Sequence, residues 1–196
     1  MINYPTKKKT NTSMNITTKS NQRGMGLEKD INDSNTFYRE CNRALIYKKP
    51  TPVQVVRVDY PKRSSAKIVE GYYKTPSTTD YNGLYRGKYI DFEAKETKSK
   101  ASFTFKNIHE HQIQHLEDVQ KHGGIAFLII RFTLYNETYL IDASHIIDAY
   151  KDQKQKSIRY EKVKECGCLI CESFTPRLKY LDIVDNLYFK EDSYGF

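Results

Sequence analysis

Thr78-Thr79-Asp80-Tyr81-Asn82-Gly83 and, shortly after, Tyr89-Ile90-Asp91-Phe92-Glu93-Ala94-Lys95 form the most informative part of the chain. In the second run apolar and polar residues alternate, which is the pattern of a β-strand with one apolar face. The opposite face then carries Asp91, Glu93 and Lys95. Tyr81-Asn82-Gly83 is typical of a turn, so we predict a hairpin that brings Asp80 close to Glu93.

Asp80, Glu93 and Lys95 together match the chemistry of a metal-dependent nuclease. Mg²⁺ binds one or two carboxylates and completes its shell with water and substrate phosphate. The bound cation polarises a phosphoryl oxygen and activates water, and a nearby ammonium stabilises the charge that develops. Glu-x-Lys is nevertheless common. The same residues, with Asp91, are equally compatible with a solvated strand face whose charges pair across strands.

The composition favours an anionic partner. The chain has 196 residues, enough for one compact domain, with 38% hydrophobic residues and a net charge of +8. Such an excess of basic residues favours nucleic acid first and acidic lipid second. No apolar run approaches the length of a membrane span, so we expect no membrane association.

The four cysteines, at positions 41, 166, 168 and 171, follow no secretory signal. We therefore expect reduced thiols and a cytoplasmic protein. Cys166, Cys168 and Cys171 offer three thiolates, but no second CxxC or HxxxH pair lies nearby to complete a zinc site. Ordinary thiols are the interpretation that we favour, with structural zinc as the alternative.

Residues 1–23 are polar and basic, end at Arg23 and contain no acidic residue. They hold too little apolar surface to fold alone, so we predict a disordered arm that either orders on DNA or stays solvated. Residues 24–196 are predicted to form one nuclease domain. Its first helix opens at Gly24 and carries Glu28 in the first turn. There Glu28 complements the helix dipole or serves the metal centre as an outer carboxylate.

A basic finger is predicted at about 59–73, after a β-branched strand at 53–58. Two extended arms flank a tip that contains Pro61 and serines, so the segment is expected to project from the core. It would enter a DNA groove or branch point; an ordinary hairpin with a solvated tip is the alternative. The basic residues that we expect to contact DNA are Arg23, Arg57, Lys62, Arg63, Lys67, Lys74, Lys98 and Lys100.

The second half of the chain alternates helices and strands. A helix is predicted at about 107–122, in which Gln112 occupies the position of the glutamate of a zinc-protease motif. We expect Gln112 to project toward the carboxylates instead. The continuous apolar run 125–132 indicates a strand buried on both faces, and the domain is a mixed sheet flanked by helices, an α/β fold. Further elements are predicted at 138–142 (strand), 143–150 (helix) and 176–188 (helix).

Several separated blocks resemble the RecU family of bacterial Holliday junction resolvases. The resemblance spans about residues 22–188 and implies the restriction-endonuclease-like PD-(D/E)xK fold with a projecting stalk. Thr79 stands where the superfamily's name has proline, as is expected within RecU itself. The blocks are Arg23-Gly24-Met25-x-Leu27-Glu28, Pro50-Thr51-Pro52, Val58-Asp59-Tyr60-Pro61, Ser77 to Gly83, Tyr89 to Thr97, His111-Gln112 and Pro176-Arg177-Leu178.

The resemblance also implies active-site roles and a Mg²⁺ cofactor, for which Mn²⁺ is a substitute. Asp80 and Glu93 would be the metal carboxylates, with Thr78 and Gln112 as further contributors. Lys95 would stabilise the transition state. Glu28 would be an additional active-site carboxylate.

A RecU-like protein is expected to resolve Holliday junctions by paired nicks on opposed strands, in homologous recombination and DNA repair. A homodimer suits this task, because it places two sites on a near-two-fold junction. The implied partners are four-way junction DNA and a RecA-type recombinase, in association with the nucleoid. Two alternatives share part of the evidence: a DNA-binding, recombinase-regulating protein without chemistry, and a duplex-specific restriction-type endonuclease.

Overall fold

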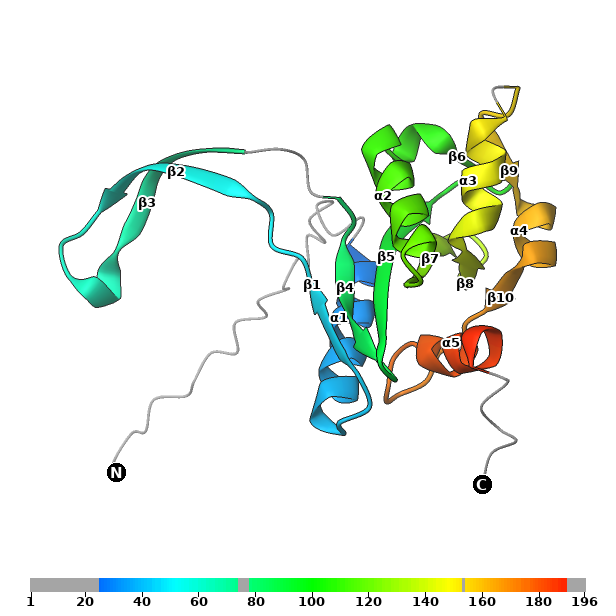
Figure 1. The fold of residues 1–196 in the computed structure, drawn as a ribbon, viewed down its shortest axis with the longest axis horizontal. Coiled ribbons are helices and arrows are strands. Elements are labelled where there is room, and N and C mark those ends of the chain that lie inside the picture. The colour runs from blue at the N-terminus through cyan, green and yellow to red at the C-terminus, as the bar shows by residue number, and fades with distance from the viewer. Residues whose placement is uncertain (1–24, 74–77, 153, 190–196) are drawn as a thin grey trace, which may run out of the picture.

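A six-stranded mixed sheet forms the middle layer of the residues that the computed structural model describes, which are 25–73, 78–152 and 154–189 (Figure 1). The strand order is β1-β4-β5-β7-β8-β10. β5 and β7 are parallel, and the other neighbouring pairs are antiparallel. The bounds are β1 (Leu45–Lys48), β4 (Tyr81–Tyr85), β5 (Lys88–Thr97), β7 (Ile125–Phe132), β8 (Glu137–Asp142) and β10 (Gly167–Leu169).

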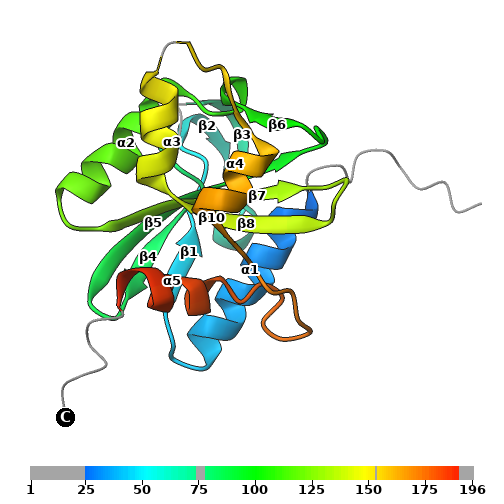
Figure 2. The ribbon, with the colours of Figure 1, turned by 90° about the vertical axis from the view of Figure 1, so that its right-hand side faces the viewer.

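Helices cover both faces of this sheet (Figure 2). One face is covered by α1 (Met25–Glu40) and α5 (Tyr180–Tyr188), and the other by α2 (Glu110–Lys121), α3 (Ala143–Lys151) and α4 (Tyr160–Cys166). α2 belongs to the crossover that joins β5 to its parallel neighbour β7. The predicted α/β fold, a mixed sheet flanked by helices, is confirmed. The short elements β6 (Ser102–Thr104) and β9 (Ser157–Arg159) pair with each other, and η3 (Phe105–Asn107) is a 3-10 turn.

β7 is buried along its whole length, as its continuous apolar sequence predicts. Phe127 and Ile129 pack on the side of α1 and α5, whereas Leu128 and Ile130 pack on the side of α2, α3 and α4. Each face of the strand therefore belongs to a separate hydrophobic core.

Stacked aromatic rings join the three central strands. The ring of Tyr81 on β4 lies 4.9 Å from that of Phe92 on β5, and Phe92 lies 4.7 Å from Phe127 on β7, with nearly parallel planes. Tyr180 of α5 packs against Phe92 at 5.5 Å. Because such contacts add to the free energy of burial, the stack favours one register of these strands.

β4 and β5 form the predicted hairpin, but its turn is not at Tyr81-Asn82-Gly83, which belongs to β4. The chain turns at Arg86 and Gly87, with φ of 47° and 77°. Positive φ at both central residues of a two-residue loop is the geometry of a type I′ turn, which suits the twist of the flanking strands. The prediction of a turn at 81–83 is wrong.

Gly83 has a packing role instead. The backbone of β1 approaches it so closely that a Cβ atom would lie 2.0 Å from the carbonyl oxygen of Leu45 and 2.6 Å from the Cα atom of Ile46. The glycine therefore allows β1 to pair with β4, and a residue typical of turns here marks a close approach of two strands.

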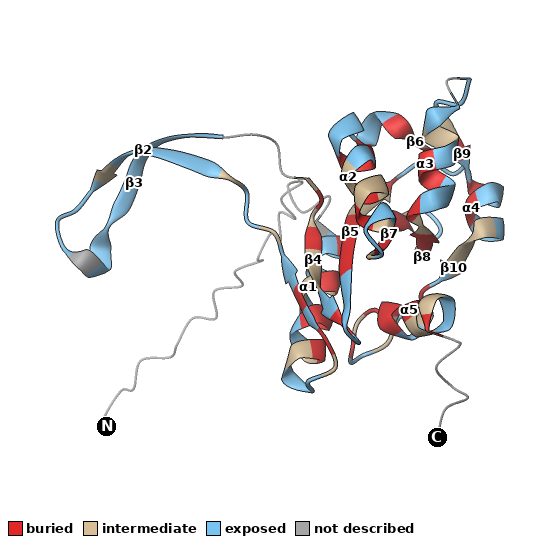
Figure 3. Ribbon diagram, viewed as in Figure 1, coloured by how far each residue is buried: buried red, intermediate tan, exposed pale blue. Residues whose placement is uncertain are grey.

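β2 (Val53–Asp59) and β3 (Lys67–Tyr73) form a two-stranded ribbon that projects from the sheet, with the 3-10 turn η2 (Arg63–Ser65) near its tip (Figure 1). Almost every residue along it is exposed (Figure 3). The predicted projection is confirmed, but it begins earlier than the predicted residue 59, because the strand that begins at Val53 is its first arm. We call residues 53–73 the stalk.

Two predicted helices begin later than expected. α2 begins at Glu110 rather than near 107, because 105–107 is a 3-10 turn and His109 is extended. α5 begins at Tyr180 rather than at 176, because Leu178 forms a β-bridge with Glu172. The predictions of β8 and α3 are confirmed.

The predicted arm at 1–23 lies outside the described residues. None of the described helices is long and apolar enough to cross a membrane. The four cysteines are free, and within the described ranges no three His, Cys, Asp or Glu side chains are grouped to hold a metal ion.

Gly83→Ala should lower the free energy of unfolding by at least about 3 kcal/mol, because its methyl group would overlap the backbone of β1. Gly87→Ala is the matched control: open space surrounds Gly87, and only its left-handed φ opposes the change, at a cost of about 1 kcal/mol. Urea unfolding of both variants measures the difference. A smaller loss at Gly83 than at Gly87 would contradict the close approach.

Candidate active site

The register of β4 and β5 sets the centre of the site. Tyr81 pairs with Phe92, so the residue before Tyr81 lies beside the residue after Phe92. The Asp80 backbone N–H donates a hydrogen bond to Glu93 Oε2 at 3.0 Å, and the Ala94 backbone N–H donates to Asp80 Oδ2 at 3.3 Å. These contacts confirm that the hairpin brings Asp80 and Glu93 together.

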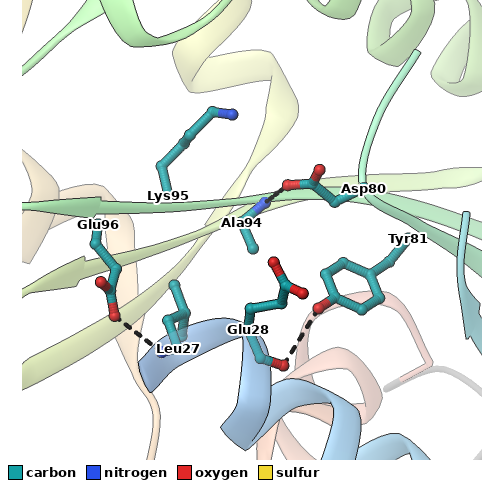
Figure 4. Close-up of a pocket in the computed structure, with 7 residues that line it drawn as sticks. All are labelled: Leu27, Glu28, Asp80, Tyr81, Ala94, Lys95 and Glu96. Atoms are coloured by element: carbon teal, nitrogen blue, oxygen red, sulfur yellow. Dashed lines mark hydrogen bonds between the residues drawn. The ribbon is translucent and has the colours of Figure 1, made fainter. Parts of the chain in front are cut away.

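A cavity of about 220 Å³ opens beside Asp80 (Figure 4). Lys95 and Glu96 leave β5 on opposite sides, and Glu28 reaches the cavity from the first turn of α1. Helix α1, strand β5 and the residue just before β4 therefore contribute charged groups to one small space. Its lining is completed by Leu27, Tyr81 and Ala94.

Glu93 is fully buried, and the positive charge near it does not fully compensate its own negative charge and that of Asp80. Its Oε1 atom pairs with the Lys95 ammonium, which is its ion-pair partner among the described residues. Burial chiefly, and the negative charge of Asp80 next, raise the pKa of Glu93 to about 7, against the opposing effect of Lys95. A site with this balance of charges is stabilised by an added cation.

Asp91 lies on the same face of β5 and is also fully buried. The alternative of a solvated strand face is wrong, because α2 packs over this part of β5. Unlike Glu93, Asp91 has many partners: Lys49 Nζ at 2.7 Å, the Tyr89 hydroxyl at 2.8 Å and His115 Nε2 at 3.0 Å. The Thr79 hydroxyl donates to its other oxygen.

Lys49 holds the segment that leads into Asp80. Its ammonium donates to Thr78 Oγ1 at 2.9 Å and Thr79 Oγ1 at 2.6 Å, and its backbone N–H donates to the Asp80 carbonyl at 2.8 Å. Thr78, two residues before Asp80, therefore has its hydroxyl oxygen directed at Lys49, and its role at the metal centre stays a prediction. Sequence reasoning missed Lys49, because nothing in its local pattern separates it from the neighbouring Lys48.

Gln112 and Glu28 make contacts outside their predicted roles. Gln112 Oε1 accepts a hydrogen bond from the His109 backbone N–H at 3.0 Å, at the N-terminus of α2. The carboxylate of Glu28 pairs with Lys48 while it lines the cavity. Neither contact brings the side chain to Asp80 or Glu93, and both metal-centre roles stay predictions.

The basic residues predicted to contact DNA lie on two surfaces. Those of the stalk and of the loop after β5 are exposed, as contact with DNA requires. They are Arg57, Lys62 and Lys67 on the stalk, and Lys98 and Lys100 in the loop. Arg23, Lys74 and the side chain of Arg63 lie outside the described part of the chain.

Comparison with known proteins gives a family. The family model described as "RecU: Recombination protein U" matches residues 22–186. The chain is 58% identical over 170 residues to Holliday junction resolvase RecU of Geobacillus kaustophilus, with 85% of each chain covered. It is 50% identical over 198 residues to the protein of the same name from Bacillus cereus strain G9842, with 96% of this chain and 98% of the relative covered.

Among solved structures, the chain is similar to Archaeoglobus fulgidus Hjc, a Holliday junction resolvase from an archaeal hyperthermophile. The TM-score is 0.41 at 10% identity, over 72% of this chain and 94% of that one. The family assignment rests on the sequence matches, which cover most of the chain. This protein belongs to the RecU, or recombination protein U, family.

Proposed function

We propose that the protein is a divalent-metal-dependent endonuclease that resolves four-way DNA junctions by paired nicks on opposed strands. The observation that carries the proposal is the contact of Asp80 with Glu93 beside Lys95, in a chain of the RecU family. The substrate is taken from relatives named Holliday junction resolvase. The reaction serves homologous recombination and DNA repair.

The oxygen atoms of the site suit a hard cation, and we assign Mg²⁺, with Mn²⁺ as a substitute. Asp80 and Glu93 supply the carboxylates that such a cation prefers. The raised pKa of Glu93 supports this assignment, because it reports a buried carboxylate in need of positive charge. Thr78 and Gln112 are assigned as further oxygen donors on the family resemblance alone, since their side-chain oxygens here accept from Lys49 Nζ and from the His109 N–H. When bound, the cation supplies Lewis acidity toward the phosphate and a water of lowered pKa.

Lys95 acts on the phosphate. Its ammonium is held by Glu93 Oε1, and a quarter of its side chain is exposed, so it can meet a substrate without leaving its position. There it donates to the phosphate oxygen that gains charge in the transition state. Asp80 keeps its orientation through the Ala94 N–H. We assign Glu28, across the cavity, to the same reaction as an outer carboxylate.

The stalk places the junction. Its exposed basic residues contact phosphates, and a homodimer sets two nuclease sites on opposed strands. Residues 1–23 are assigned as a basic arm of the 24–196 nuclease domain. A RecA-type recombinase partner and nucleoid association stay predictions from the family resemblance.

The wild-type protein should make symmetric nicks in a mobile four-way junction with Mg²⁺, and EDTA should abolish them. Asp80→Asn should lower the single-turnover rate by at least about 10³-fold, because it removes charge from the cation site. Lys95→Ala should lower the rate by about 10²-fold or more and leave the junction Kd nearly unchanged. Gel electrophoresis of end-labelled junctions measures the nicks.

Asp33→Asn is the control, because Asp33 is an exposed acid of α1 that pairs with Lys29, one turn away on the same helix. Its cleavage rate should equal that of the wild type. Binding without cleavage by the wild type would favour a non-catalytic DNA-binding protein. Equal cleavage of linear duplex would favour a restriction-type endonuclease.

Glu93→Gln should stabilise the metal-free protein at pH 8. Because the folded-state pKa of Glu93 is raised to about 7, the contribution of this group to the free energy of unfolding is fully present below its unfolded pKa and is lost as pH rises through the folded-state pKa. The variant lacks this loss and should gain about 2 kcal/mol over the wild type at pH 8 and little at pH 4.5. Thermal unfolding in EDTA measures the difference.

Added Mg²⁺ should then stabilise the wild type more than Glu93→Gln, because only the wild type keeps both carboxylates. Equal stabilisation of the two proteins by Mg²⁺ would show that Glu93 does not bind the metal ion. A variant that is less stable than the wild type at pH 8 would contradict the charge imbalance.

Replacing Lys62 and Lys67 by alanine should weaken junction binding and reduce the slope of log K against log salt by about 2, because two phosphate contacts are lost. The control replaces Lys162 and Lys164 of α4, which removes the same charge away from the stalk. Fluorescence anisotropy across a salt series measures both. An equal change in slope for the two double variants would show that the stalk lysines act through the net charge of the protein and not through contacts of their own with phosphates.

A further inference from the structure

The ammonium group of Lys49 joins the two segments of the chain that meet at the base of the stalk. Lys49 lies between β1 and the stalk, on the chain that leads out. Thr78 and Thr79 lie between the stalk and β4, on the chain that returns. Since Lys49 Nζ donates to both threonine hydroxyls, it closes the base of the stalk immediately before Asp80.

The nuclease sheet and α2 hold this ammonium in place. Asp91 Oδ2 on β5 lies 2.7 Å from Lys49 Nζ, and His115 Nε2 on α2 lies 3.4 Å from it. The Asp91 side chain is fully buried and that of Lys49 is 14% exposed. A charge pair so enclosed, with hydrogen bonds in several directions, permits few arrangements of its members.

The same lysine also holds Asp80 through the main chain. Its backbone N–H donates to the Asp80 carbonyl oxygen at 2.8 Å, which extends the pairing of β1 with β4 by one residue. Asp80 is therefore fixed from both sides, by Lys49 on the β1 side and by the Glu93 and Ala94 contacts on the β5 side.

We propose that Lys49, held by Asp91 and His115, is a positioning residue that locks the stalk base to the metal carboxylate Asp80. This inference rests on the proposed nuclease function and adds a residue to it. Lys49 does not touch the reacting atoms; it acts through the threonines and the Asp80 backbone. Because small displacements of a reacting group can cost about 10²-fold in rate, losing this lock should impair cleavage more than binding.

The test uses two variants and a matched control. Lys49→Met keeps a long side chain but removes the donors, and it leaves Asp91 buried without its lysine. Lys49→Met with Asp91→Asn removes both charges, so it avoids an unpaired buried carboxylate and should recover thermal stability. Lys121→Met is the control, because it removes an exposed ammonium from α2, away from the stalk base.

Four measurements are made on each protein in full-length form: hydrogen exchange over 78–82, Mn²⁺ affinity without DNA, single-turnover junction cleavage at saturating Mn²⁺, and junction Kd in EDTA. Both Lys49 variants should exchange faster at 78–82, bind Mn²⁺ about 10-fold more weakly and cleave about 10- to 100-fold more slowly. Their junction Kd should stay within about 3-fold of the wild type, and Lys121→Met should match the wild type throughout.

Unchanged exchange at 78–82 and unchanged Mn²⁺ affinity in the Lys49 variants would overturn the proposal. Recovery of cleavage together with stability in the double variant would also overturn it, since Lys49 would then serve folding alone. If the wild type cleaves no junction, the proposed function fails, whereas the exchange and Mn²⁺ data still decide whether Lys49 positions Asp80.

Discussion

The structure depends on the register in which β4 meets β5. Tyr81 stacks on Phe92, and Phe92 stacks on Phe127, so three strands are aligned by rings in the apolar core. A slip of one residue would turn every side chain of β5 to the opposite face, placing charges in the core on one side and apolar residues under α2 on the other. The same alignment leaves Asp80 beside Glu93. Packing that stabilises the fold thus also determines the geometry of the carboxylates.

Asp91 and Glu93 are both buried on one face of β5, but only the charge of Asp91 is fully compensated by its neighbours. Asp91 is surrounded by an ammonium, an imidazole and two hydroxyls, which compensate the loss of hydration. Glu93, two residues on, pairs with Lys95, but its burial chiefly and the like charge of Asp80 next raise its pKa. The first arrangement is typical of a structural ion pair, and the second of a site that receives a cation. The compensated charges around Asp91 therefore lie next to Asp80 and Glu93 and can hold these two carboxylates in place, while the need for a cation stays with Asp80 and Glu93.

Much of the fold could be read from the sequence, because alternation and apolar runs are local signals. β5, β7 and the exposed stalk were predicted from such patterns, and the family blocks pointed to Asp80, Glu93 and Lys95. Gly83 was misread as a turn residue, since its small size serves a strand, β1, that lies far away in sequence. The burial of Asp91 depends on α2, and the role of Lys49 depends on two segments, before and after the stalk, that meet only when the chain has folded. Such contacts leave no periodic trace.

The stalk has a consequence for solubility. A ribbon of two strands has two open edges, whose free N–H and C=O groups invite pairing with other chains, and its valines at 53, 55, 56 and 69 are exposed. The register is broken on both sides of Arg57, where bulges interrupt the even spacing of edge groups and increase the local twist. Lysines near the tip add repulsion between copies. The irregularity that bends the ribbon therefore also opposes its growth into an intermolecular sheet.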